Sequence, residues 1–204
     1  MAEGIVEVTA GSGTKLHSWS KTVGANTVHD EFTLPGEYPY ASYFALAIAI
    51  SCATADSHII QLMAGSSLNV RIRRITWSQH ANATTAALDA IQVWRLSTAG
   101  TGGVAVTPAK LDTADAASGA TAMTLPTAKG TEVTQLTQEI VVMRQAILAT
   151  SAQFDDSWEW YQKPGMKPII IAAGTSNGIA FKHTTAIAAA TANVTIEFVE
   201  TNFV

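Results

Sequence analysis

The feature that most constrains the fold is an alternation of large and small apolar residues from position 43 onward. Phe44, Leu46, Ile48 and Ile50 are separated by alanines. A repeat at every second position is the period of a β-strand, whose successive side chains point to opposite faces. Alanine favours helices, so a buried helix is the competing interpretation. The isoleucines and the upstream Pro39 favour the strand.

Further segments of strand character follow along the chain. They span residues 58–63, 68–77, 88–96, 135–148, 153–161, 168–172, 178–183 and 193–199. At Arg73 and Arg74 the alternation slips by one position, which is typical of a β-bulge. Many strands with Gly and Pro turns between them predict an all-β fold, either an antiparallel sandwich or a barrel.

The pattern also divides the chain into a lead-in and a main domain. Residues 1–41 are polar and predict an extended N-terminal arm that needs a partner surface to become ordered. Residues 42–204 predict the β-sandwich domain, interrupted by a long loop at about 97–134. A short helix is expected within that loop at 112–118, with Asp112 as its N-cap.

Composition narrows the classes of partner. The net charge is −4, and charged residues make up 14% of the chain, against about 25% in an average protein. This balance argues against a nucleic-acid partner. Such a surface suits either a protein that buries its exterior against neighbours or a plain β-protein rich in small residues. The apolar run 43–53 is shorter than the roughly 20 residues that span a bilayer, so no membrane partner is expected.

No catalytic or metal-binding constellation is evident. The histidines at 17, 29, 58, 80 and 183 have no neighbour at ligand spacing, so neither a metal nor a cofactor is predicted. Cys52 lies in an apolar run and is predicted to be a buried, inert thiol. The acidic pair Asp155 and Asp156 predicts a solvated turn. We therefore expect a protein that is not an enzyme.

Two groups of residues are candidates for interaction. Trp158, Trp160 and Tyr161 form an aromatic group that would serve as core, as a protein-contact site or as a sugar platform. Arg71 and Arg73 form a small basic cluster, for which a polar strand face is the simpler interpretation and a nucleic-acid patch the alternative.

The sequence pattern of the turns and strands resembles that of a known group of proteins. The resemblance lies in residues 68–75, 98–108, 112–120, 167–174, 178–181 and 194–198, and it covers roughly residues 42–200. These segments resemble the small jelly-roll structural proteins of tailed bacteriophages. The lead-in is not covered, and no catalytic residue carries over.

The resemblance implies an antiparallel, jelly-roll-like β-sandwich in the virion, assembled in the host cytoplasm. It implies a capsid decoration or cement protein that stabilises the phage head. The partners would be the major capsid protein or other virion proteins, and the chain would form a homo-oligomer, with a trimer favoured. The alternative is a tail, fibre or spike component that binds a host surface glycan.

Overall fold

The computed structural model describes residues 18–23, 26–31, 41–81, 87–137, 140–144, 157–165 and 167–202. The chain separates into two compact units, residues 1–39 and 40–204. In the first unit, β1 (Ser18–Val23) and β2 (Asn26–Glu31) form an antiparallel hairpin. The lead-in therefore contains regular structure that its polar sequence did not suggest.

The second unit is built from strands, and the described residues contain no helix, so the all-β prediction is confirmed. Its strands are β3 (Ser42–Ser51), β4 (Ser57–Met63), β5 (Asn69–Ala81), β6 (Ala87–Leu96), β7 (Val104–Val106), β8 (Ala109–Lys110), β9 (Thr121–Thr124), β10 (Glu132–Gln135), β11 (Ile140–Arg144), β12 (Ser157–Tyr161), β13 (Ile169–Ile171), β14 (Gly178–His183) and β15 (Thr191–Thr201). The run of alternating large and small residues at 43–50 lies in β3, so its interpretation as a strand is confirmed.

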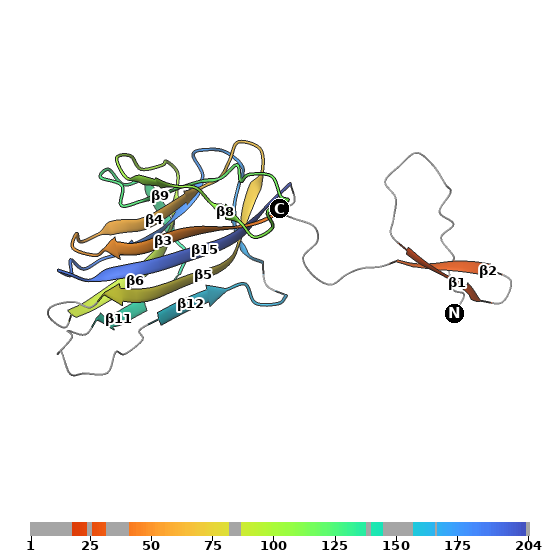
Figure 1. The fold of residues 1–204 in the computed structure, drawn as a ribbon, viewed down its shortest axis with the longest axis horizontal. Helices are drawn as coiled ribbons and strands as arrows, with labels where there is room; N and C mark the ends of the chain where they lie inside the picture. The colour runs from red at the N-terminus through yellow and green to blue at the C-terminus, as the bar shows by residue number, and fades with distance from the viewer. Residues whose placement is uncertain are drawn as a thin grey trace. The chain divides into compact units, whose positions relative to one another are not determined.

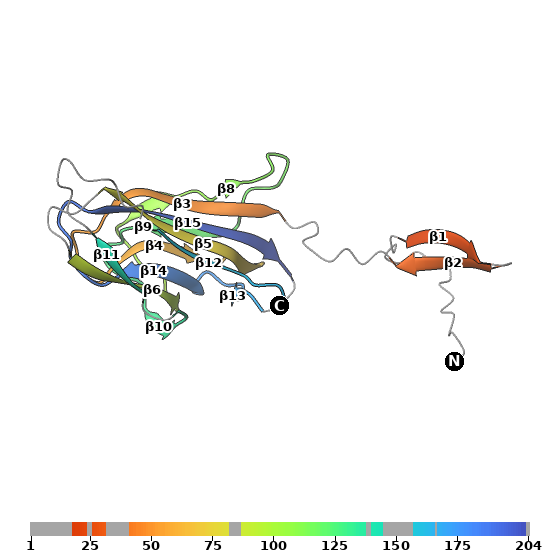
Figure 2. The same cartoon turned by 90° about the horizontal axis from the view of Figure 1, so that it is seen from below.

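The strands form two antiparallel sheets in a sandwich-like arrangement (Figures 1 and 2). The first, called the β4 sheet, has the order β10-β6-β14-β4-β9-β7, with β11 also paired to β6. The second, called the β5 sheet, has the order β12-β5-β15-β3-β8, with β13 also paired to β5. Figure 1 shows β3, β15, β5 and β12 of this sheet side by side.

Strand pairing is nested between the two ends of the unit. The first strand, β3, pairs with the last, β15, and β4 pairs with β14. Moving inward along the chain, β5 pairs with β12 and β6 with β11. The pairs belong alternately to the β5 sheet and the β4 sheet. The strands from the first part of the unit are thus paired in order with the strands from its last part, alternately in one sheet and in the other.

The core fills the space between the sheets. Trp77 of β5, Phe198 of β15 and Phe181 of β14 are fully buried. Phe181 meets Trp158 of the opposite sheet at 5.9 Å between ring centroids, and Tyr43 stacks on Phe198 at 5.5 Å. Burying one large apolar side chain stabilises the fold by about 1.5–3 kcal/mol. The contact of Phe181 with Trp158 joins the two layers, whereas Tyr43 and Phe198 lie on paired strands of the β5 sheet.

The predicted β-bulge in β5 is confirmed. Arg74 pairs with Glu197 and Ile72 pairs with Phe198, so Arg73 is the extra residue. The bulge lets Val70 and Ile72, and then Ile75 and Trp77, all reach the core despite the slip in alternation.

The segment between β6 and β10, residues 97–131, is called the excursion. Its strand β9 pairs with β4 and β7 pairs with β9, while β8 pairs with β3. The excursion thus adds short strands to one edge of each sheet. Its two ends meet at a base, where Thr101 and Ala128 exchange backbone hydrogen bonds of 2.9 and 3.1 Å. The stretch expected to be a long loop carries this regular structure.

The helix expected at 112–118 is wrong. Asp112 does cap a single turn, because its Oδ1 accepts a bond of 2.9 Å from the Ala114 N–H. The turn does not continue: the carbonyl oxygen of Ala116 accepts from the Tyr43 hydroxyl at 3.1 Å, and beyond the expected helix the Gly119 N–H donates to the carboxylate of Glu200 on β15. A tertiary contact overrides the local helix signal here.

Candidate functional site

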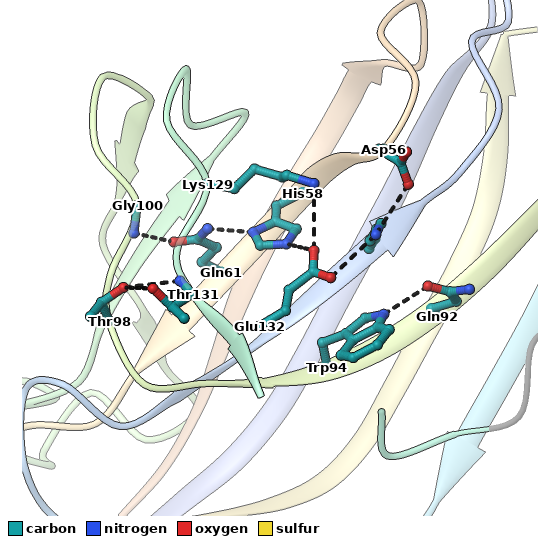
Figure 3. A network of polar contacts seen from close by, with 11 residues as sticks. Asp56, His58, Gln61, Gln92, Trp94, Thr98, Gly100, Lys129, Thr131 and Glu132 are labelled. Carbon is teal, nitrogen blue, oxygen red and sulfur yellow. Dashed lines mark hydrogen bonds and ion pairs between the residues drawn. The ribbon is translucent and has the colours of Figure 1, made fainter. Parts of the chain in front are cut away.

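A network of interacting polar side chains lies on the outer face of the β4 sheet, beneath the excursion (Figure 3). Strand β4 is buried at every position, unlike a strand with one solvated face. Ile60 pairs with Phe181 and His58 pairs with Lys182, which leaves Ile59 as a bulge residue. This bulge directs His58 and Gln61 away from the core that Ile60 joins.

Three hydrogen bonds in series link β4 to the excursion. The Gly100 N–H donates to Gln61 Oε1 at 2.8 Å. Gln61 Nε2 donates to Nδ1 of His58, and His58 Nε2 contacts Glu132 Oε1 at 2.8 Å. We call this series the relay.

The relay fixes the protonation state of the imidazole. A backbone N–H can only donate, so the Gln61 oxygen must face Gly100 and its NH₂ group must face His58. Nδ1 of His58 is therefore an acceptor, and the proton of the neutral ring lies on Nε2, which donates to Glu132.

Glu132 connects the relay to a cluster of charges. Lys182 Nζ lies 3.3 Å from Glu132 Oε2 and 3.1 Å from Asp56 Oδ1. Lys129 Nζ lies 3.6 Å from Glu132 Oε1. The Lys182 ammonium is also 5.6 Å from the centroid of the Trp94 ring, a favourable cation–π distance. The cluster beside His58 thus contains two carboxylates and two ammonium groups, and its charges balance.

The surroundings shift three pKa values. Burial is the largest influence on His58 and lowers its pKa, although Glu132 opposes the effect. Burial would raise the pKa of Glu132, but the bonds to His58 and Lys182 outweigh it and the pKa is lowered. The hydrogen bond from Lys182 lowers the pKa of Asp56. The network is therefore stable with both carboxylates charged and the imidazole neutral.

Gly100 can approach Gln61 this closely because it lacks a side chain. A Cβ atom there would lie 2.6 Å from the Ala128 carbonyl oxygen, 2.8 Å from Pro126 Cβ and 2.9 Å from Gln61 Nε2. The glycine is therefore needed for the relay and for the base of the excursion at once. No local pattern around residue 100 indicates this role.

A second polar cluster, on the inner face of the same sheet, has the composition of a catalytic triad. Ser57 Oγ lies 2.6 Å from His183 Nε2, and His183 Nδ1 lies 3.4 Å from Asp89 Oδ2. Asp89 Oδ1 accepts from the backbone N–H groups of Thr184 and Thr185 at 3.2 and 3.0 Å. A nucleophile must reach its substrate, but Ser57 is only 8% exposed and its two partners are buried. The cluster ties β4, β6 and β14 together.

The aromatic residues singled out in the sequence do not form one platform. Trp158 and Trp160 are half-buried and pack against the core, whereas Tyr161 is 53% exposed. Trp158 and Trp160 share one face of β12, and Tyr161 points to the other, as strand alternation requires. Asp155 and Asp156 lie outside the described residues.

The basic residues singled out in the sequence, Arg71 and Arg73, are half-buried. Arg73 donates to Gln162 Oε1 at 2.7 Å, and Arg71 lies between Ile170 and Val199 of the neighbouring strands. The next arginine, Arg74, pairs instead with Glu159 and Glu197. These contacts agree with a polar strand face.

A groove of about 570 Å³ lies where β6, β10 and β13 meet. Arg95 and Lys167 line it together with Val133, Pro168 and Asn177. The Arg95 guanidinium donates to the Ile170 carbonyl at 2.7 Å, so this side chain bridges the two sheets. The groove holds no carboxylate among its lining residues.

The remaining sequence expectations concern metals, the thiol and the membrane. Among the described residues, no three His, Cys, Asp or Glu side chains gather in a way that could hold a metal ion. Cys52 is a buried free thiol, as predicted. No helix long and apolar enough to cross a bilayer occurs in the described parts of the chain.

Comparison of the chain with protein-family models, with curated protein sequences and with solved structures gave no match. Sequence reasoning missed the relay and the Ser57–His183–Asp89 cluster, because their members are far apart in sequence and meet only through strand register.

Proposed function

We propose that this chain is a non-enzymatic structural protein of a tailed-phage virion, acting as a capsid decoration or cement protein that stabilises the head. The observation that carries the proposal is the nested pairing of β3 with β15, β4 with β14, β5 with β12 and β6 with β11. We infer from it a jelly roll, an architecture that viral capsid proteins use repeatedly. A fold alone does not determine function, so the proposal also rests on the charged residues, the two units and the aromatic group.

The charged residues of the sandwich support a structural role over nucleic-acid binding. Arg74 is matched by two glutamates, and Lys182 by Asp56 and Glu132. Lys110 donates to the carbonyl oxygens of Thr113 and Asp115. A surface that binds phosphates keeps its cations available, whereas these cations serve the chain's own contacts.

The two-unit organisation supports binding to a lattice. Residues 1–39 form a compact unit of their own, and we propose that this unit contacts a neighbouring subunit. A protein that binds an assembled shell more tightly than its dissociated subunits stabilises the shell by mass action. Symmetric assembly as a trimer on the shell, with the major capsid protein as partner, completes this proposal.

The alternative, a fibre or spike protein that binds a host glycan, rested on the aromatic group at 158–161. Trp158 and Trp160 face the core, and Tyr161 alone is well exposed. Sugar platforms use rings whose faces are accessible, so this arrangement favours decoration over glycan binding.

Light scattering coupled to size-exclusion chromatography tests the proposal on the full chain, alone and with empty expanded heads of the phage that encodes it. The expected result is a stable trimer that co-elutes with expanded heads and raises their melting temperature. Unexpanded heads serve as the matched control. A monomer that fails to associate with either form of head would contradict the proposal, and binding to a glycan array would then favour the alternative.

A further inference from the structure

We propose that the relay from Gly100 through Gln61 to His58 is an acid-sensitive latch, which holds the base of the excursion on the β4 sheet at neutral pH and releases it below. The inference goes beyond the proposed function and does not depend on it. It rests on the donors and acceptors of the relay and on the burial of the imidazole.

The first step is that the relay can be made in one direction only. Gly100 contributes a fixed donor, Gln61 has one acceptor and one donor group, and Nδ1 of His58 must accept. If the ring gains a proton, Nδ1 becomes a donor and opposes the Gln61 NH₂ group. Turning the amide over restores that contact, but it then points the NH₂ group at the Gly100 N–H.

The second step is that the environment gives the extra proton little compensation. The charged groups that act on His58 are Glu132 from β10, Lys182 from β14 and Lys129 from the end of the excursion. Lys182 is paired in turn with Asp56 from the turn before β4. The two negative and two positive charges of these four groups already balance. The His58 side chain is fully buried, so a net positive charge there is poorly solvated.

The third step links the ring to the excursion. Gly100 lies beside Thr101, which exchanges backbone hydrogen bonds with Ala128 at the base. Ser97 N also donates to the Thr131 oxygen at 3.0 Å, and Thr98 Oγ1 bonds both the side chain and the N–H of Thr131. Loss of the bond from Gly100 to Gln61 removes a direct contact between this ladder and β4, while the pairing of β9 with β4 remains.

The sign of the pH effect follows from burial. The pKa of His58 is lowered from its ordinary value of 6.5. Below pH 6.5, the latched state therefore binds fewer protons than the open state. The stabilisation by the latch is fully present above pH 6.5, and it is lost as the pH falls toward the lowered pKa. One proton changes the opening equilibrium by at most about tenfold per pH unit.

Hydrogen exchange with mass spectrometry on the full chain tests the latch. At pH 7.5 and pH 5.0, after correction for intrinsic exchange rates, we expect peptides covering 97–101 and 128–131 to lose about 10-fold or more of their protection at the lower pH. Peptides from β15 serve as the internal reference. Equal protection of the base at the two pH values, relative to β15, would overturn the proposal.

Two variants sharpen the test. His58→Asn places an amide oxygen where Nδ1 accepts and cannot titrate, so the pH effect at the base should disappear; the matched control His80→Asn, at an exposed position, should retain it. Gln61→Glu offers a carboxylate to a protonated ring, so acid should then strengthen the base. A pH effect in His58→Asn as large as in the unaltered chain would refute the latch.

A measurement on the unaltered chain keeps the test independent of how the variants fold. By NMR, the His58 ring and the Gly100 amide proton should titrate with one common midpoint. Separate midpoints, or a Gly100 signal that does not respond to pH, would show that the two groups are not coupled.

Discussion

The outer faces of the two sheets both carry charged side chains, but one face is covered and the other is open. On the β4 sheet, His58 and Lys182 lie beneath the excursion and are buried. On the β5 sheet, Arg74 and Glu159 form an ion pair, and their side chains are 45% and 46% exposed. Charged contacts on the two faces therefore have different consequences, because solvent screens the Arg74–Glu159 pair and hardly reaches His58 and Lys182.

The difference also appears along the strands. Strand β4 is buried at all seven of its positions, whereas β5 alternates between buried and more exposed residues over most of its length. A strand that is buried on both faces must pair every polar side chain that it carries. The covered face should therefore be sensitive to mutation, and the open face tolerant.

The largest expected effect is that of Gln61→Leu. The substitution keeps the approximate volume but leaves the Gly100 N–H and the His58 Nδ1 without partners in a buried site. Each unsatisfied buried group costs about 1–3 kcal/mol, so we expect a loss of about 2–5 kcal/mol in the free energy of unfolding by urea titration. A loss below about 1 kcal/mol would mean that the relay is not buried as described.

The next effect is that of Gly100→Ala. The added methyl group would lie 2.6 Å from the Ala128 carbonyl oxygen. Because this oxygen belongs to the backbone, it can move away only if the base of the excursion shifts. Overpacking of this kind costs about 1–3 kcal/mol. Faster proteolysis within the excursion, compared with Gly119→Ala as a control where the nearest atom to an added Cβ lies 3.8 Å away, would report it. Equal proteolysis of the two variants would contradict the close approach.

A smaller effect, with a defined pH dependence, is expected for Lys182→Met. The variant keeps an apolar stem beside Trp94 but removes the ammonium that lowers the pKa values of Glu132 and Asp56. Because lowered carboxyl pKa values stabilise the fold above their ordinary range and this stability is lost in acid, the variant should be about 1 kcal/mol less stable at pH 7. The difference should shrink toward pH 3. Thermal melts at the two pH values measure it, and a constant difference would argue against the charge network.

The smallest effect is that of Arg74→Gln on the open face. Exposed ion pairs contribute about 0–1 kcal/mol, so the free energy of unfolding should change by less than about 1 kcal/mol, and added salt should reduce the difference further. A loss as large as that of Gln61→Leu would remove the distinction between the two faces.

Much of the fold could be predicted from sequence because the signals are local. The alternation at 43–50 predicted β3, and the slip at Arg73 predicted the bulge in β5. The prediction of a helix at 112–118 failed because this stretch is held by side chains far away in sequence: Tyr43 donates to the Ala116 carbonyl oxygen, and Glu200 accepts from the Ser118 hydroxyl. Local propensity carries no information about such a partner.

The polar clusters could not be predicted for the same reason. His58 meets Lys182 because β4 and β14 are antiparallel in one particular register, and a bulge at Ile59 decides which face His58 occupies. Gln61 meets Gly100 because the excursion folds back over the sheet. The individual residues carry no spacing motif, so only the assembled strands reveal the relay.

The protonation state of His58 is the most direct test of the contrast between the covered and the open face. A long-range proton–nitrogen NMR spectrum of the histidine side chains at pH 7, with His58→Asn used for assignment, measures it. We predict a neutral ring that carries its proton on Nε2, with Nδ1 accepting a hydrogen bond. A ring protonated on both nitrogens, or one with its proton on Nδ1, would contradict the relay and the coverage of this face by the excursion.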